Sequence, residues 1–197
     1  MSSSVPVLVK RHIFGVNNKF NDNIEFLDSD TLIYVAGRNI VLYNIEEHSQ
    51  RFIVGSSPSS EHWVSDPEIC CFTLSPSTQF LAIAERGEKP SITILDTQTL
   101  RKKKVLSIPS NIRSKEICSM SFDITNTFIA IQCGSPDWKL CVYDWNKQIM
   151  IHCITTSKDM TPITQIAYKY SNPDPSPIDP HFLAVCHSDS IQIHQQC

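Results

Sequence analysis

The apolar residues of the chain fall in short runs in which apolar and polar side chains alternate. Ser91-Ile92-Thr93-Ile94-Leu95 is one such run, and this period of two is that of a β-strand with one buried face. No window carries the i, i+3, i+4, i+7 apolar stripe of an amphipathic helix for more than a turn or two. Turn-forming pairs such as Asn146-Lys147 and Ser188-Asp189 separate the runs. The pattern predicts an all-β chain.

Two of these runs recur at a nearly constant interval. One series consists of Ile69–Ala84, Ile117–Ile131 and the interrupted copy Ile163–Tyr168 with Phe182–Cys186. The second ends in Asn44, Asp96, Asp144 and Gln195, at steps of 52, 48 and 51 residues. A repeat of short strands at this spacing is typical of four-stranded β-propeller blades of the WD-repeat kind, which take ~40–45 residues plus any long loops.

We therefore expect a WD-repeat-type β-propeller segment of about four four-stranded blades, with an incomplete ring because the last blade is truncated. The expected units are an N-terminal extension with a candidate closing strand (1–22), blade 1 (23–54), blade 2 (69–108), blade 3 (117–154) and a partial blade 4 (163–197). The open blade edges favour self-association, with Val5–Val9 as an alternative strand that closes the ring from within.

The four expected blades comprise fifteen strands, because the last blade lacks its outer strand. The expected strands are Asn23–Leu27, Thr31–Ala36, Ile40–Ile45 and Arg51–Val54; Ile69–Leu74, Phe80–Glu85, Ser91–Leu95 and Lys103–Ile108; Ile117–Phe122, Phe128–Cys133, Lys139–Asp144 and Gln148–Ile154; and Ile163–Tyr168, Phe182–His187 and Ile191–His194. The inner strands Ile69–Leu74 and Ile117–Phe122 are expected to be the best buried, and Phe128 to be a core residue.

Several residues stand where WD repeats have their signature. Leu74 to Ala82 resembles the F-S-P-D-G-x-x-L-A hairpin of these blades. Asp96 and Asp144 match the aspartate of the Trp-Asp dipeptide, with Leu95 and Tyr143 in the place of tryptophan, and Tyr43-Asn44 is a more distant copy. No Gly-His dipeptide precedes any blade, so the hydrogen-bond relay associated with that dipeptide is not expected.

A narrower resemblance covers nearly the whole chain. The segments His12–Gly15, Asn23–Asp28, Thr31–Tyr34, Ala36–Asn39, Tyr43–Ile45, Arg51–Ile53 and Glu88–Ile94 resemble the N-terminal blades of the cilia- and flagella-associated protein 57 family. This resemblance implies a large axonemal scaffold with N-terminal propellers followed by coiled coil, tied to inner-arm dyneins and their regulatory complexes. The present sequence contains none of the coiled coil.

Composition narrows the class of partner. With 197 residues and a formal charge of −3, the chain has no bulk positive field to attract nucleic acid or anionic membranes. It has neither a long apolar stretch nor a secretory leader pattern, so we expect a cytoplasmic protein. The eight cysteines show no C-x-x-C spacing and lie mostly in apolar runs, which indicates reduced, structural thiols.

The sequence offers little catalytic or ligand-binding chemistry. It has no G-x-S-x-G turn, phosphate-binding glycine loop or paired carboxylates, so neither an enzyme nor a cofactor is expected. His181 and His187, with Asp179 or Asp189, form a metal-site alternative to plain exposed strand ends.

Two features carry more than one interpretation. The run Arg101, Lys102, Lys103 and Lys104 is a candidate site for an acidic partner such as a tubulin tail, or an outer strand whose lysines discourage edge pairing. Trp138 and Trp145 either pack between blades or line a peptide groove.

Two functions remain after these exclusions. The first is a non-enzymatic protein-interaction scaffold of the ciliary or flagellar axoneme, with dynein-associated or regulatory-complex partners as the resemblance implies, here in a truncated form. The alternative is a short soluble WD-repeat fragment or isoform without an axonemal role, unstable or regulatory through pairing with other propeller proteins.

Overall fold

The computed structural model describes residues 15, 23–55, 68–156, 163–168, 181–187 and 190–196. Every regular element in these ranges is a β-strand. The strands are β1 Ile24–Phe26, β2 Thr31–Ala36, β3 Asn39–Asn44, β4 Ser49–Val54, β5 Glu68–Leu74, β6 Phe80–Arg86, β7 Ser91–Asp96, β8 Lys102–Ser107, β9 Ile117–Phe122, β10 Phe128–Cys133, β11 Lys139–Asp144, β12 Ile149–Thr155, β13 Ile163–Tyr168, β14 His181–His187 and β15 Ile191–Gln196.

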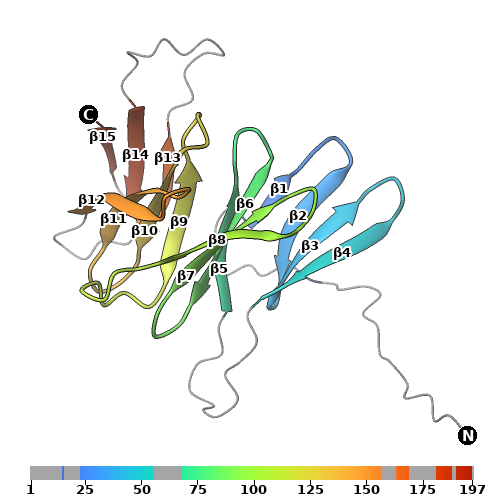
Figure 1. The fold of residues 1–197 in the computed structure, drawn as a ribbon, viewed down its shortest axis with the longest axis horizontal. Helices are drawn as coiled ribbons and strands as arrows, with labels where there is room; N and C mark the ends of the chain where they lie inside the picture. The colour runs from blue at the N-terminus through green and yellow to red at the C-terminus, as the bar shows by residue number, and fades with distance from the viewer. Residues whose placement is uncertain are drawn as a thin grey trace, which may run out of the picture.

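The strands form four antiparallel meanders that follow one another along the chain. The sheet orders are β1-β2-β3-β4, β5-β6-β7-β8, β9-β10-β11-β12 and β13-β14-β15. Figure 1 shows the sheets standing one after another, from the blue first sheet to the red fourth. The innermost strand β9 lies against β5 on one side and β13 on the other, as first strands do around a propeller axis. The predicted all-β, partial propeller fold is confirmed.

The strand bounds differ from the predicted ones mainly at the outer strands. β4 begins at Ser49, two residues before the predicted start, because Ser49 pairs directly with Asn44 across the turn. β8 begins at Lys102 for the same reason, since Lys102 pairs with Leu95. The candidate closing strand Val5–Val9 and the proline-rich segment 171–180 lie outside the described residues.

The core lies between the sheets. One cluster packs the first sheet on the second through residues such as Ile33, Ile40 and Leu81, and a second joins the middle two sheets. A third joins the last two sheets and includes Trp138 and Val185. A single blade cannot bury its apolar face alone, so the stacking of neighbouring blades supplies the core.

The expectation that the inner strands are the best buried is wrong in detail. β10 and β11 are buried at every position except their first residues, which is no less than β5 or β9. Phe128 is only partly buried against the third cluster, and the fully buried phenylalanine of this blade is Phe122, 0% exposed.

Candidate protein-interaction surface

The three residues at the predicted WD-like aspartate position close the same turn in three blades. Each lies at the end of the third strand, and its side-chain oxygen accepts a hydrogen bond from the backbone N–H three residues later. These bonds run from Glu47 N to Asn44 Oδ1 (2.7 Å), Thr99 N to Asp96 Oδ1 (2.8 Å) and Lys147 N to Asp144 Oδ1 (3.0 Å). Short polar side chains favour turns by such local bonds. In this structure the three residues therefore stabilise turns.

The residue that follows each of these turns has a left-handed backbone. The φ values are 51° at His48, 55° at Leu100 and 58° at Gln148. This conformation costs an L-residue roughly 1–2 kcal/mol, and glycine adopts it freely. The side-chain hydrogen bond of the preceding Asn or Asp helps to hold the turn in this conformation.

Hydrogen bonding holds two of these aspartates in their charged form. The backbone N–H of Thr99, with its hydroxyl and Lys103, lowers the pKa of Asp96 below its usual value of 3.8. At Asp144 the ammonium of Lys147, 2.8 Å away, is the first cause of the lowered pKa. A lowered carboxyl pKa is the opposite of what a general acid near neutral pH requires.

A second set of turn residues lies between the first and second strands of the blades, and of these Ser75 falls within the hairpin resemblance found in the sequence. Asp28 Oδ1 accepts from Thr31 N (2.6 Å), and Ser75 Oγ accepts from Phe80 N (3.0 Å). Asp123, which is 0% exposed, accepts from the N–H groups of residues 125, 127 and 128 and from the Thr125 hydroxyl. An oxygen-bearing side chain one or two residues after each first strand was the signal that could have found them.

The two tyrosines of the WD-like positions have different contacts. Tyr43 Oη lies 2.9 Å from His48 Nδ1 within its own turn. Tyr143 Oη donates to the carbonyl of Ser107 in the neighbouring blade at 3.2 Å, and burial raises its pKa. Tyr143 thus joins two blades.

The tryptophans pack between blades, as one of their two interpretations predicted. Trp145 lies edge-on to Phe80 of the second blade, with ring centroids 4.8 Å apart. Its Nε1 donates to the Asn126 carbonyl at 2.8 Å. Trp138 belongs to the cluster between the last two blades.

The basic run lies on the rim of the second blade. Arg101 precedes β8, and Lys102, Lys103 and Lys104 are its first three residues. β8 is the last strand of its sheet and pairs only with β7. Arg101, Lys102 and Lys103 are exposed, and Lys103 Nζ lies 3.4 Å from Asp96 Oδ2. A rim of this kind can meet an acidic partner and can also discourage edge pairing.

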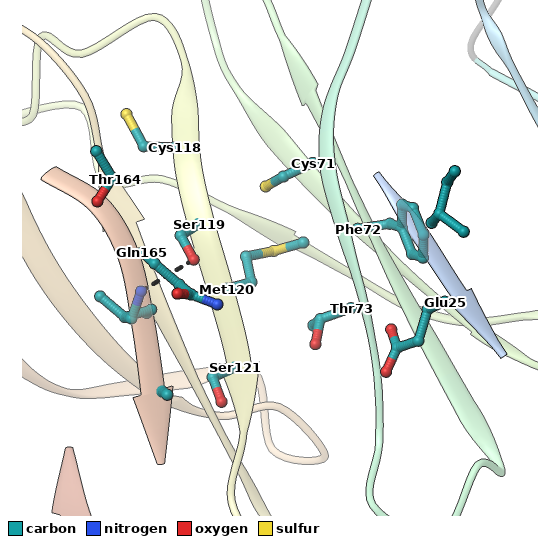
Figure 2. Close-up of a pocket in the computed structure, with 13 residues that line it drawn as sticks. Glu25, Cys71, Phe72, Thr73, Cys118, Ser119, Met120, Ser121, Thr164 and Gln165 are labelled. Carbon is teal, nitrogen blue, oxygen red and sulfur yellow. Dashed lines mark hydrogen bonds between the residues drawn. The ribbon is translucent and has the colours of Figure 1, made fainter. Parts of the chain in front are cut away.

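A cleft of about 320 Å³ lies between the inner strands. Figure 2 shows Ser119, Met120 and Ser121 on one strand and Cys71 and Thr73 on the facing strand, with Glu25 beyond them. Glu25 is the one carboxylate among the lining residues. The cleft therefore offers hydroxyls, two thiols and one carboxyl group to a partner.

Side chains in the cleft link the inner strands of adjacent blades. The hydroxyls of Ser119 and Ser121 accept from the backbone N–H groups of Ile166 (3.1 Å) and Tyr168 (3.2 Å). The Cys71 thiol donates to the Ile117 carbonyl at 3.6 Å. Neighbouring inner strands do not pair as a ladder, so these bonds satisfy backbone groups at their free edges.

The described residues hold no group of three His, Cys, Asp or Glu side chains that could bind a metal ion. The metal alternative involves Asp179 and Asp189, which lie outside the described residues; of His181 and His187, which start and end β14, only the backbone is described. None of the described elements is a helix that could cross a bilayer.

The described cysteines are free thiols. Burial raises the pKa of Cys70 to about 11 and that of Cys118 to about 12. Since the thiolate is the nucleophile, these two groups are poorly reactive near neutral pH, in agreement with structural thiols.

The sequence of the chain is similar to those of ciliary and microtubule-associated proteins. The chain is 30% identical over 159 residues to cilia- and flagella-associated protein 57 of Mus musculus, covering 79% of this chain and 12% of that protein. It is 34% identical over 99 residues to cilia- and flagella-associated protein 57 C of Tetrahymena thermophila, covering 50% of this chain and 7% of that protein. A 77 kDa echinoderm microtubule-associated protein of Lytechinus variegatus is 24% identical over 140 residues, 70% of this chain and 20% of that protein.

No family model matches the chain. The chain spans about an eighth or less of the two ciliary relatives, 12% and 7%. The names of these relatives agree with the predicted ciliary or flagellar localisation. The resemblance inferred from the residues is confirmed: the chain is a homologue of one segment of cilia- and flagella-associated protein 57.

Proposed function

We propose that the chain acts as a non-enzymatic protein-interaction scaffold of the ciliary or flagellar axoneme, linked to inner-arm dynein or its regulatory complexes. One observation carries the proposal. The side chains of Asp96, Asp123 and Asp144 are used to close turns. Within the described residues, the rim of the second blade and the cleft between the inner strands are surfaces that a partner can reach.

The names of the relatives support a cytoskeletal setting. One is a microtubule-associated protein, and the others are cilia- and flagella-associated proteins. We assign Arg101 and Lys102–Lys104 to the contact with an acidic protein surface. Arg101, just before the outer strand, and Lys102 and Lys103 on it are exposed, and a surface charge there acts on association more than on the fold.

Self-association through blade edges is a further part of the proposal. β15 is the last strand of its sheet, and its Ile191 and Ile193 are 68% and 70% exposed. Exposed apolar strand edges are templates for pairing with another chain.

Localisation of the tagged chain in ciliated cells, with proximity labelling, tests the axonemal role. The informative variant is Arg101→Glu with Lys102→Glu, and its matched control is Lys89→Glu with Lys115→Glu, which changes the net charge equally at exposed sites. We expect an axonemal signal that the first pair weakens and the control pair retains. A diffuse cytoplasmic signal for the unaltered chain would favour the alternative, a soluble WD-repeat fragment without an axonemal role.

A further inference from the structure

Three cysteines of the third blade lie together on neighbouring strands. Cys133 is on β10, Cys141 on β11 and Cys153 on β12. The Sγ atoms of Cys141 and Cys153 are 3.1 Å apart. Cys141 is fully buried, and a hydrogen bond to Cys133 on its other side is the first cause of its raised pKa. Cys153 is half-buried on the outermost strand.

The strand register determines which two of these three cysteines can form a disulfide. Cys141 and Cys153 are direct cross-strand partners. Such partners have Cα atoms about 4.5–5.5 Å apart, within the roughly 4.4–6.8 Å that a disulfide spans. On β10, the partner of Cys141 is Ile131, so Cys133 lies on the diagonal, at about 7–8 Å. The geometry fits a bond between Cys141 and Cys153, and not one between Cys133 and Cys141.

We propose that Cys141 and Cys153 are a modification site at which an oxidised low-molecular-weight thiol forms an intramolecular disulfide that fastens β12 to its blade. The thiolate of the accessible Cys153 attacks a sulfur of the small disulfide, which releases one small thiol and leaves a mixed disulfide on Cys153. The thiolate of Cys141 then attacks the Cys153 sulfur and releases the second small thiol. The two cysteines lose two electrons and two protons in total, and the small disulfide becomes two thiols.

The position of β12 gives this bond a structural consequence. β12 pairs only with β11 and ends its sheet. Apart from Cys153, all its residues are exposed, including Ile149 at 56% and Ile151 at 43%. A strand with so little buried surface opens more readily than the core. The disulfide would therefore control whether this outer strand can leave the blade.

The raised pKa values set the conditions of the reaction. Burial raises the pKa of Cys153 to about 12, so little thiolate is present near neutral pH. Thiol–disulfide exchange depends on the thiolate fraction, and the rate of bond formation should rise with pH across the neutral and mildly alkaline range. The equilibrium extent of oxidation is the more direct test of the geometry.

The test equilibrates the full reduced chain with mixtures of reduced and oxidised glutathione, followed by acid quenching, alkylation and tryptic digestion without reductant. Trypsin cuts after Lys139 and Lys147, which separates all three cysteines into different peptides. The chains compared are the unaltered protein, Cys153→Ser, and Cys133→Ser as the matched control at the neighbouring thiol.

We expect linked peptides containing Cys141 and Cys153, with the loss of two hydrogen atoms, in the unaltered chain and in Cys133→Ser. The link should be absent from Cys153→Ser. A link that involves Cys133, a glutathione adduct on Cys153 that persists without closing the bond, or alkylation of both cysteines across the whole redox series would overturn the proposal.

Discussion

The burial of Phe122 allows a quantitative test of how the blades hold together. Phe122 ends β9 and is 0% exposed in the cluster between the second and third blades. Its ring lies edge-on to Trp145 with centroids 6.4 Å apart, and Trp145 in turn contacts Phe80 of the second blade. Truncation of Phe122 therefore removes apolar contact at the point where two blades meet.

We expect Phe122→Ala to lower the free energy of unfolding by about 3–5 kcal/mol, the range for buried aromatic residues. Because the stability of a domain is typically only about 5–15 kcal/mol, this loss should be large in a urea titration. Phe128→Ala is the matched control. Because Phe128 is only partly buried, this substitution should lower the free energy of unfolding clearly less than Phe122→Ala.

The assay is equilibrium urea unfolding followed by tryptophan fluorescence, with the slope compared between variants to check for a common mechanism of unfolding. A loss for Phe122→Ala that is no larger than that of Phe128→Ala would refute the reasoning. It would mean that the contact between the second and third blades does not limit the stability of the chain.

Three further predictions follow from the turns and the rim. Thr78 is exposed and has a left-handed backbone with φ of 57°. Thr78→Gly should therefore stabilise the chain by about 0.5–1 kcal/mol, whereas Thr78→Ala, which keeps the Cβ atom, should not. Thermal unfolding distinguishes the two variants. The folded-state pKa values of Asp28, Asp96, Asp137 and Asp144 are lowered from 3.8. The contribution of these carboxylates to the free energy of unfolding is therefore complete well above pH 3.8 and disappears as the pH falls through the lowered values. Urea midpoints that stay constant between pH 6 and roughly pH 2 would contradict this. Reversal of Arg101 and Lys102 to Glu should change the free energy of unfolding by less than ~0.5 kcal/mol; loss of cooperative unfolding would show that this segment is internal.

The local pattern of the sequence was enough to predict the strands and their period. A strand with one face packed on a neighbour needs alternate apolar residues, and a tight turn needs a short polar side chain at a defined position. Both features can therefore be recognised from residues that are close in the sequence. For this reason Thr31–Ala36, Phe128–Cys133 and Lys139–Asp144 were predicted with their observed bounds, and Asn44, Asp96 and Asp144 were found at equivalent positions.

Only the tertiary structure decided how the blades meet. Phe122 and Phe128 look equivalent in the sequence, but stacking buries one completely and leaves the other at a boundary. The bonds from Ile166 and Tyr168 to Ser119 and Ser121 join positions 47 residues apart. Likewise, nothing in the spacing of Cys141 and Cys153 indicates contact; the register of β11 and β12 brings their sulfurs together. Such contacts depend on the relative placement of whole strands and sheets, which no local pattern of side chains records.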